Sequence, residues 1–441
     1  MDEINRMLAR QRQADLVREA QRSQLAREHQ AARRAPARLG LSRELWLVVL
    51  GIFLNYVGYG AVLPFEVIYL HDGRGFNLGV AGLVVGLING VAVVTAPLAG
   101  PLIDRFGARA VAAGAGVVLA AGYTGLAFVH SPAQAFVAAA IAGAGNGALN
   151  PSQSTLVATL APQQLRHRAT AVSRVAANVG VGIGGGVGGL VAAYGLTGFV
   201  VLFLANGVTY LVYVCVLVAV VRGDARPEPI TGGYRLVVRD RAFVQLALMN
   251  VAMIAVGWGV FTWLVPPYAK DEVGISAQLI GLLLLANAAT VVLAQVPIAV
   301  FAEGRRRAVM MALAAGMFVG ACLLVLAAGT GTDLAIAALF VAAVLVGVGE
   351  CFHTTVLMPL AADLAPAGLR GRYMASIGLS WWIGLAIASA FGAQLLSVSP
   401  TAAFLVAAVV ALAAGVSALT LERRLPDACR LTPRPHRSPD E

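Results

Sequence analysis

The sequence predicts an all-α membrane protein in which twelve transmembrane helices form two pseudo-symmetric six-helix bundles, with both termini in the cytoplasm. Three observations support this prediction: the composition, the spacing of apolar segments and an internal repeat. Hydrophobic residues make up 59% of the chain and charged residues only 12%. A water-facing surface carries about a quarter to a third charged residues, so most of this protein's surface must face lipid.

Apolar segments of about 20 residues, long enough to cross a bilayer, occur twelve times along the chain. The first six cover residues 45–70, 78–102, 110–128, 133–160, 171–196 and 198–221. The second six cover residues 243–268, 275–301, 308–328, 334–364, 373–396 and 401–421. The predicted domains are a cytoplasmic Arg-rich tail (1–44), a first bundle (45–221), a cytoplasmic linker (222–242), a second bundle (243–422) and a cytoplasmic tail (423–441).

The distribution of Lys and Arg indicates the orientation. Short loops rich in these residues stay in the cytoplasm, and with the N-terminus inside, the loops facing outside contain only Arg74 and Lys270. No cleavable signal peptide is expected, because residues 1–44 are polar and Arg-rich, and residues 2–34 are expected to form a solvated helix. The expected location is the cell membrane, and the bias towards Ala, Val, Gly and Arg is typical of a high-GC bacterium.

The two halves of the chain share a repeated sequence. The segment LAPQQLRHR at residues 160–168 recurs as LAPAGLRGR at residues 364–372, each time between the fourth and fifth helices of a half. Parallel repeats related by an axis along the membrane normal are found in one large class of secondary transporters, which bind substrate near the midplane between the halves. The repeat therefore predicts two related bundles and a site between them.

The loop between the second and third helices contains Gly100, Asp104, Arg105, Gly107 and Arg109, and it resembles the signature loop of the major facilitator superfamily. The resemblance implies the twelve-helix major facilitator fold over nearly the whole chain. It also implies that the acid and arginines make charge contacts that hold one conformation and release in another. The alternative is that the arginines only fix topology, but an acid does nothing for topology.

The fifth helix carries Gly180, Gly184, Gly185, Gly188 and Gly189, a pattern similar to the antiporter motif of proton-coupled drug exporters in that superfamily. The family pattern has Pro where Gly185 stands. The glycines at every fourth position also predict close helix packing, because small residues let helix backbones approach in lipid. Both interpretations can hold together.

Glu350 is the one carboxylate deep inside a predicted membrane helix. An ionisable side chain at the bilayer centre costs about 2.5–3.5 kcal/mol on insertion scales, so we expect Glu350 to bind and release a proton. The alternative is an ion pair with Arg174 that only joins the halves. His353, one turn along the same helix face, is expected to share the proton or bind substrate, or to be simply hydrogen-bonded. The equivalent position in the first half is Asn146. Because this amide does not titrate, the two halves together are expected to contain a single proton site.

The surroundings of Arg174 and the dipeptide Gly349-Glu350 resemble the bacterial multidrug exporters that place an acid in the tenth helix. Many drug antiporters carry an Arg in the fourth helix where this chain has Ala139, so Arg174 is the expected substitute. Aromatic and amide side chains are expected to line a weakly charged substrate cavity. These are Asn55, Tyr56, Tyr59, Asn146, Asn150, Asn178, Trp258, Phe261, Asn287 and Trp381. Glu66, near the outer end of the first helix, is expected to be solvated.

Three functions remain open. The first is proton-coupled export of hydrophobic or amphipathic small molecules such as drugs or secondary metabolites. The second is uptake or facilitated diffusion of a polar nutrient, which would need more polar side chains in the cavity. The third is a non-transporting receptor, which has no use for a buried acid. No enzyme motif is present, so no cofactor and no metal site are expected. The expected partners are a small-molecule substrate, protons and membrane lipid, without nucleic acid or ATP, and the expected state is a monomer.

Overall fold

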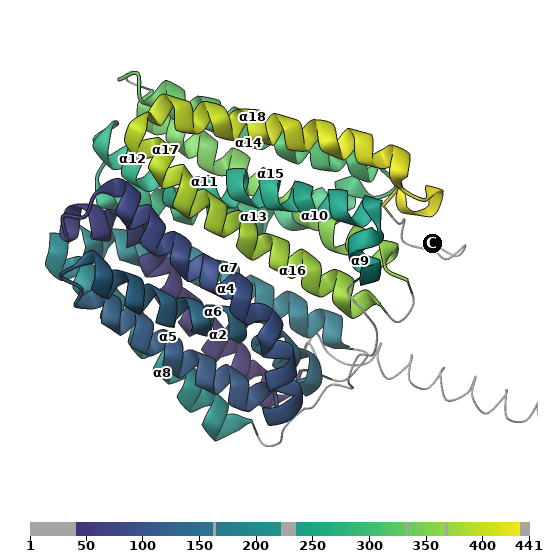
Figure 1. Ribbon diagram of the computed structural model, residues 1–441, viewed down its shortest axis with the longest axis horizontal. Coiled ribbons are helices and arrows are strands. Elements are labelled where there is room, and N and C mark those ends of the chain that lie inside the picture. Colours follow the sequence, from purple (N-terminus) through teal and green to yellow (C-terminus); the bar gives the residue numbers. More distant parts are fainter. Residues whose placement is uncertain (1–40, 162–164, 222–234, 332–333, 367–368, 433–441) are drawn as a thin grey trace, which may run out of the picture. The chain divides into compact units, whose positions relative to one another are not determined.

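The computed structural model describes residues 41–161, 165–221, 235–331, 334–366 and 369–432 (Figure 1). Within these residues the secondary structure is helical, apart from one isolated β-bridge between Arg306 and Leu431. The predicted all-α class is therefore confirmed. The expected N-terminal helix over residues 2–34 and most of the linker lie outside the described residues.

The first half contains six long helical segments. The first is α2 (Arg43–Val62), which continues through η1 (Leu63–Phe65), α3 (Glu66–Ile68) and η2 (Tyr69–Gly73). The others are α4 (Leu78–Phe106), α5 (Ala108–Ala127), α6 (Pro132–Leu160), α7 (Arg166–Ala192) and α8 (Gly195–Val220). Side chains of Asn77 and Ser131 cap α4 and α6 by accepting hydrogen bonds from backbone N–H groups of the first turn.

The second half begins with the short helix α9 (Arg235–Arg239), followed by α10 (Arg241–Ile254), η4 (Ala255–Gly259), α11 (Val260–Trp263) and α12 (Val265–Asp271). Next come α13 (Ala277–Ala302), α14 (Arg307–Ala328) and α15 (Ala335–Leu364). The last helices are α16 (Arg370–Ile387), η5 (Ala388–Gly392), α17 (Ala393–Val398) and α18 (Pro400–Leu421), before the short turns η6 (Glu422–Arg424) and η7 (Asp427–Cys429).

Eleven helical segments of the described chain are long and apolar enough to cross a membrane. The twelfth predicted span, α6, has 29 residues and is long enough, but its most apolar stretch is less hydrophobic than those of the eleven spans. Asn146, Asn150, Ser152 and Gln153 lie close together in its second half. Their amide and hydroxyl groups lower its hydropathy, which is the physical reason that α6 differs from the other spans.

The helix pairings of the first half recur in the second. Helix α4 packs on α6, α5 packs on α6 and α8, and α2 packs on α7 and α8. The equivalent pairs in the second half are α13 with α15, α14 with α15 and α18, and α10 with α16 and α18. Figure 1 shows the helices of the first half (α2 to α8) gathered apart from those of the second half (α10 to α18). The internal repeat is thus visible in the packing.

Helix α7 uses two glycine faces for two different contacts. On one face, a Cβ atom added to Gly180 would lie 2.8 Å from the backbone oxygen of Phe53 on α2, in the same half. On the other face, a Cβ atom added to Gly189 would lie 2.7 Å from the backbone oxygen of Ala277 on α13, in the opposite half. Gly281 of α13 also meets the backbone of α7. The predicted close packing of these glycines is confirmed.

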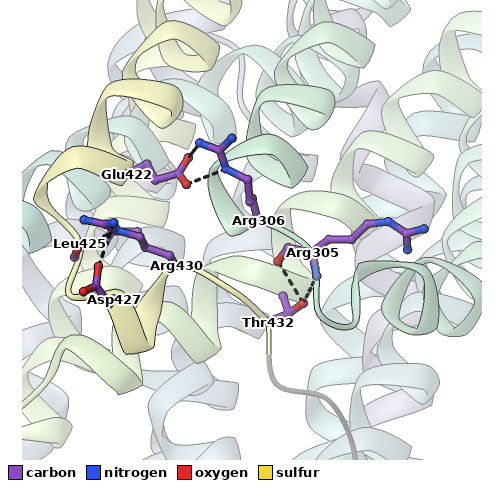
Figure 2. A network of polar contacts seen from close by, with 7 residues as sticks. All are labelled: Arg305, Arg306, Glu422, Leu425, Asp427, Arg430 and Thr432. Atoms are coloured by element: carbon purple, nitrogen blue, oxygen red, sulfur yellow. Dashed lines mark hydrogen bonds and ion pairs between the residues drawn. The ribbon is translucent and has the colours of Figure 1, made fainter.

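The segment that follows α18 folds back onto the loop between α13 and α14 (Figure 2). The Arg306 guanidinium donates two hydrogen bonds of 2.7 Å to the Glu422 carboxylate. Thr432 bonds to the backbone of Arg305, and the Arg307 N–H donates to the Arg430 carbonyl at 2.9 Å. The first residues of the predicted C-terminal tail therefore bind the body of the second half.

The neighbouring arginines of this loop differ in burial, which leads to a stability prediction. The Arg307 side chain is 1% exposed and bonds to Asp363 at 2.6 Å, whereas the Arg306 side chain is 62% exposed. We expect Asp363→Asn to lower the free energy of unfolding by about 1.5–3 kcal/mol, because it leaves a buried cation without its counter-charge. The matched change Glu422→Gln should cost less than about 1 kcal/mol. Thermal unfolding in detergent measures both, and equal losses would contradict this account.

The two faces of α7 give a second matched pair. Gly180→Ala and Gly189→Ala introduce the same methyl group at nearly the same distance from a carbonyl oxygen. We expect Gly180→Ala to lower stability by about 1–3 kcal/mol, because overpacking inside one half cannot be relieved. Gly189→Ala should lower stability much less, because the two halves can separate to make room. Thermal unfolding of both variants tests this, and an equal or larger loss for Gly189→Ala would refute it.

Candidate functional site

Glu350 and His353 lie one turn apart on α15. The carboxylate atom Oε1 of Glu350 is buried and has no hydrogen-bond partner within the described residues, and the same is true of Nε2 of His353. His353 is 2% exposed. Buried polar atoms are nearly always hydrogen-bonded, so two unpartnered titratable groups on one turn of a membrane helix mark a functional candidate.

A layer of polar side chains joins α13 to α15 beside Glu350. Gln295 of α13 donates from Nε2 to the Thr355 hydroxyl at 3.1 Å, and the Thr354 hydroxyl lies 3.5 Å from Gln295 Oε1. The Thr354 hydroxyl also donates to the Glu350 backbone carbonyl at 2.8 Å. Gln295 was not among the residues predicted from the sequence. An amide inside an apolar run was the signal that could have identified it.

Arg174 does not pair with Glu350 in the part of the chain that the structure describes. Its side chain on α7 is exposed, and the ion pairs present there involve other residues. The structural ion pair considered as an alternative role for Glu350 is therefore not formed in this conformation. Among the described residues, the acid has no cationic partner to stabilise its charged form.

Aromatic side chains expected in the cavity cluster in each half. In the second half, the Trp258 ring lies 5.9 Å from Trp381 and 5.9 Å from Trp263, measured between ring centroids. In the first half, the Tyr56 and Tyr59 rings meet edge to face at 6.2 Å. Aromatic pairs at such separations attract each other. The tryptophans of η4, α11 and α16 thus form one continuous group.

Phe261 lies apart from this tryptophan group. It is 4% exposed and lines an apolar space inside the second half, together with Cys322, Val346 and Phe404. Residues three apart normally share a helix face, but the π-helical turn η4 (Ala255–Gly259) adds a residue to the turn just before α11. That turn rotates Phe261 away from the face of Trp258.

The amides expected in the cavity divide into two groups. Asn55 is 2% exposed, and Asn287 donates to the Ala343 carbonyl at 3.2 Å, so both are buried within their own halves. Asn146 is half-buried, and Asn150 and Asn178 are exposed on α6 and α7. Only the second group remains available to a ligand in this conformation.

The structure places the signature residues at the facing ends of two helices: Gly100, Asp104 and Arg105 lie near the end of α4, Arg109 lies in the first turn of α5, and Gly107 lies between them. Gly107 adopts φ = 84°, a left-handed conformation that favours glycine. Arg109 donates from Nη2 to the Val218 carbonyl at 2.8 Å, near the C-terminal end of α8. A cation there interacts favourably with the helix dipole. Arg105 is exposed, and the Asp104 side chain lies outside what the structure describes.

Glu66 is buried, and the expectation that it would be solvated is wrong. It is 3% exposed, because the first helical segment continues past it to Gly73. The Tyr123 hydroxyl donates to its Oε1 at 3.1 Å, and Trp263 donates from Nε1 to its Oε2 at 3.2 Å. Tyr123 belongs to the first half and Trp263 to the second. Their separation from Glu66 in sequence explains why the sequence alone did not reveal this contact.

The chain is similar to known transporters in sequence. The uncharacterized MFS-type transporter YttB of Bacillus subtilis is 28% identical over 363 residues, which cover 80% of this chain and 89% of that protein. The multidrug resistance protein MdtH of Aeromonas salmonicida is 26% identical over 343 residues, covering 75% of this chain and 81% of that protein.

The fold is similar to that of solved transporters. A crystal structure of the peptide transporter POT in complex with sulfate superposes with a TM-score of 0.75 at 18% identity, covering 90% of this chain and 98% of that one. A crystal structure of a mutant of the nucleoside transporter NupG gives a TM-score of 0.71 at 13% identity, covering 87% of this chain and 100% of that one. Likeness at such low identity establishes the fold alone.

The family model described as Major Facilitator Superfamily matches residues 48–265 and again residues 246–439. The two matches together cover nearly all of the described helices, and they confirm the resemblance seen in the signature loop. The chain therefore belongs to the Major Facilitator Superfamily and is a transporter similar to multidrug transporters, not an enzyme.

Proposed function

We propose that this protein exports hydrophobic or amphipathic small molecules, such as drugs or secondary metabolites, in exchange for protons. It crosses the cell membrane twelve times as a monomer with both termini in the cytoplasm, and its two halves alternate access to a site between them. The observation that carries this proposal is the buried Oε1 atom of Glu350, which has no hydrogen-bond partner among the described residues. His353 and Arg174 assist the proton cycle, and Asp104 with its neighbouring arginines switches between conformations.

The energetics of Glu350 support its role in coupling. A carboxylate without a cation is costly in an apolar interior, but its protonated form is affordable there. The acid can therefore carry a proton if one conformation exposes it to water and the other does not. A charge moving through the membrane potential gains about 2.3 kcal/mol per 100 mV, so one proton at ~150 mV supplies ~3.5 kcal/mol, enough for a gradient of a few hundredfold.

The side chains around the proposed cavity support an amphipathic substrate. The rings of Trp258, Trp381, Tyr56 and Tyr59 offer large apolar surfaces and few hydrogen-bond donors. Asn146, Asn150 and Asn178 add neutral polar groups without a fixed charge. The named activity of the MdtH relatives, multidrug resistance, agrees with such a cavity. A sugar or other polar nutrient would need more polar partners to replace its hydration.

The coupling role of Glu350 is tested by Glu350→Gln, which keeps the size and mimics the protonated form permanently. We expect substrate binding to persist, while uphill export from proteoliposomes and its dependence on the proton gradient are lost. Downhill exchange should survive, because conformational cycling no longer waits for a proton. Glu272→Gln, which neutralises an exposed acid of the same half, is the matched control and should transport normally. Wild-type uphill export by Glu350→Gln would make Glu350 a structural residue.

A further inference from the structure

We propose that Glu66 is a second proton-binding residue, which holds the outer ends of the two halves together when protonated and lets them separate when it ionises. The proposal rests on the proposed function for the orientation of the protein in the membrane, because the helix ends near Glu66 are those predicted to face outside. It adds to that function a sensor of external pH, distinct from the coupling site at Glu350.

The geometry places one carboxylate between the two halves. Glu66 accepts a hydrogen bond from Tyr123 of α5 in its own half and from Trp263 of α11 in the other half. Tyr123 is 1% exposed and Trp263 is 2% exposed, so neither bond is open to solvent. Separation of the halves must break the bond to Trp263 and expose the carboxylate.

The groups that face Glu66 are neutral. Besides Tyr123, the phenols of Tyr59 on its own helical segment and Tyr210 on α8 lie close enough to interact with it electrostatically. The outer half of α4, which also packs on α3, carries no titratable side chain. Because these neighbours offer no cation, the closed arrangement favours the uncharged acid.

The lysine and the arginine at this end are committed to other partners, and the acids Asp271 and Glu272 are exposed. Lys270 of α12 pairs with Asp72 of the first half, and this pair is partly exposed to solvent, as are His71 and Asp271 beside it. The Arg74 side chain donates to the Tyr69 hydroxyl at 2.7 Å and to the Ala127 carbonyl. In the described part of the chain, no ion pair involves Glu66. A negative charge at Glu66 would therefore stay uncompensated as long as the halves remain closed.

Apart from the partly exposed Lys270–Asp72 pair, the other described hydrogen bonds between the halves join neutral groups. The Asn89 amide lies 3.4 Å from the Ser389 hydroxyl, and the Gln394 amide donates to the Gly79 carbonyl at 2.8 Å. These neutral groups do not titrate. Among the described hydrogen bonds between the halves, the bond from Trp263 is the buried one that involves an ionisable group. The dependence of closure on pH is thus assigned to Glu66.

The tryptophan group connects this contact to the proposed substrate cavity. Trp263 donates to Glu66, and its ring lies 5.9 Å from Trp258, which in turn lies 5.9 Å from Trp381. A ligand that moves Trp258 would disturb the position of Trp263. When the outer ends separate, Glu66 meets external water and releases its proton there. When a proton returns to Glu66 from the same side, the outer ends close. This cycle moves no net proton across the membrane, so net proton transport is assigned to Glu350.

Pulsed EPR distance measurements test this proposal on the full-length protein. Spin labels at Ala133 and Thr401 report on exposed outer positions of opposite halves. Cys215 is the exposed cysteine and is replaced by Ala, whereas the other cysteines are buried. We expect the short-distance, closed population to grow as the pH is lowered, with a closed-to-open ratio that changes by up to about tenfold per pH unit for one proton.

Two acid variants then separate the roles. Glu66→Gln should stay closed and lose the pH response, because the amide has the size of the protonated acid and cannot ionise. Glu350→Gln should keep the response of the outer ends, and Trp263→Phe should reduce the closed population at every pH. A wild-type pH response in Glu66→Gln would overturn the proposal, as would a wild-type protein whose distances do not change with pH.

If Glu66→Gln does not fold, the Trp263→Phe result still decides whether this contact holds the outer ends together. Because these distances do not depend on transport, a failure of the export proposal would be seen separately, in the proteoliposome assay.

Discussion

A bilayer interior supplies no water to a polar group, and this constraint governs the structure of the whole protein. It requires helices, because each helix satisfies its own backbone, and it requires side chains such as Ser152 and Thr95 to bond to carbonyls one turn earlier. Arg307, which is buried at the start of α14, is likewise accompanied by a counter-charge from Asp363. Under the same constraint, an acid kept without a partner is costly. Glu350, whose Oε1 has no hydrogen-bond partner among the described residues, and Glu66, which has two neutral donors but no cation, are the two costly acids for which we propose functions.

The same constraint explains how each half can be tightly packed while the two halves still move relative to each other. Lipid gives no hydrophobic force between helices, so backbones must approach through small residues. Helix α7 makes such an approach to α2 with Gly180 and to α13 with Gly189. The first contact holds α7 inside its half. The second is the kind of contact that can open without unfolding either half, and it lies at the same end of the bundles as Glu66.

Hydropathy and the repeat predicted the helical class and the helices themselves, because both follow from local composition. Helix α6, with Asn150 and Gln153, remains the span on which the structure and the predicted count of twelve differ. Glu350 stood out in sequence because an acid interrupts an apolar run. Glu66 was misjudged because its burial depends on Tyr123 and Trp263, which are far away in the chain. Phe261 lies apart from the tryptophan group because a π-helical turn shifts the helix register, and hydropathy does not reveal such a turn.

Proton release from the purified protein on substrate binding tests the central claim most directly. A weakly buffered solution with a pH indicator is titrated with a panel of hydrophobic dyes, antibiotics and sugars. If Glu350 exchanges its proton for an amphipathic substrate, dyes or antibiotics should release protons from the wild type but not from Glu350→Gln, and sugars should release none. Release by sugars alone, or equal release from both proteins, would contradict the account.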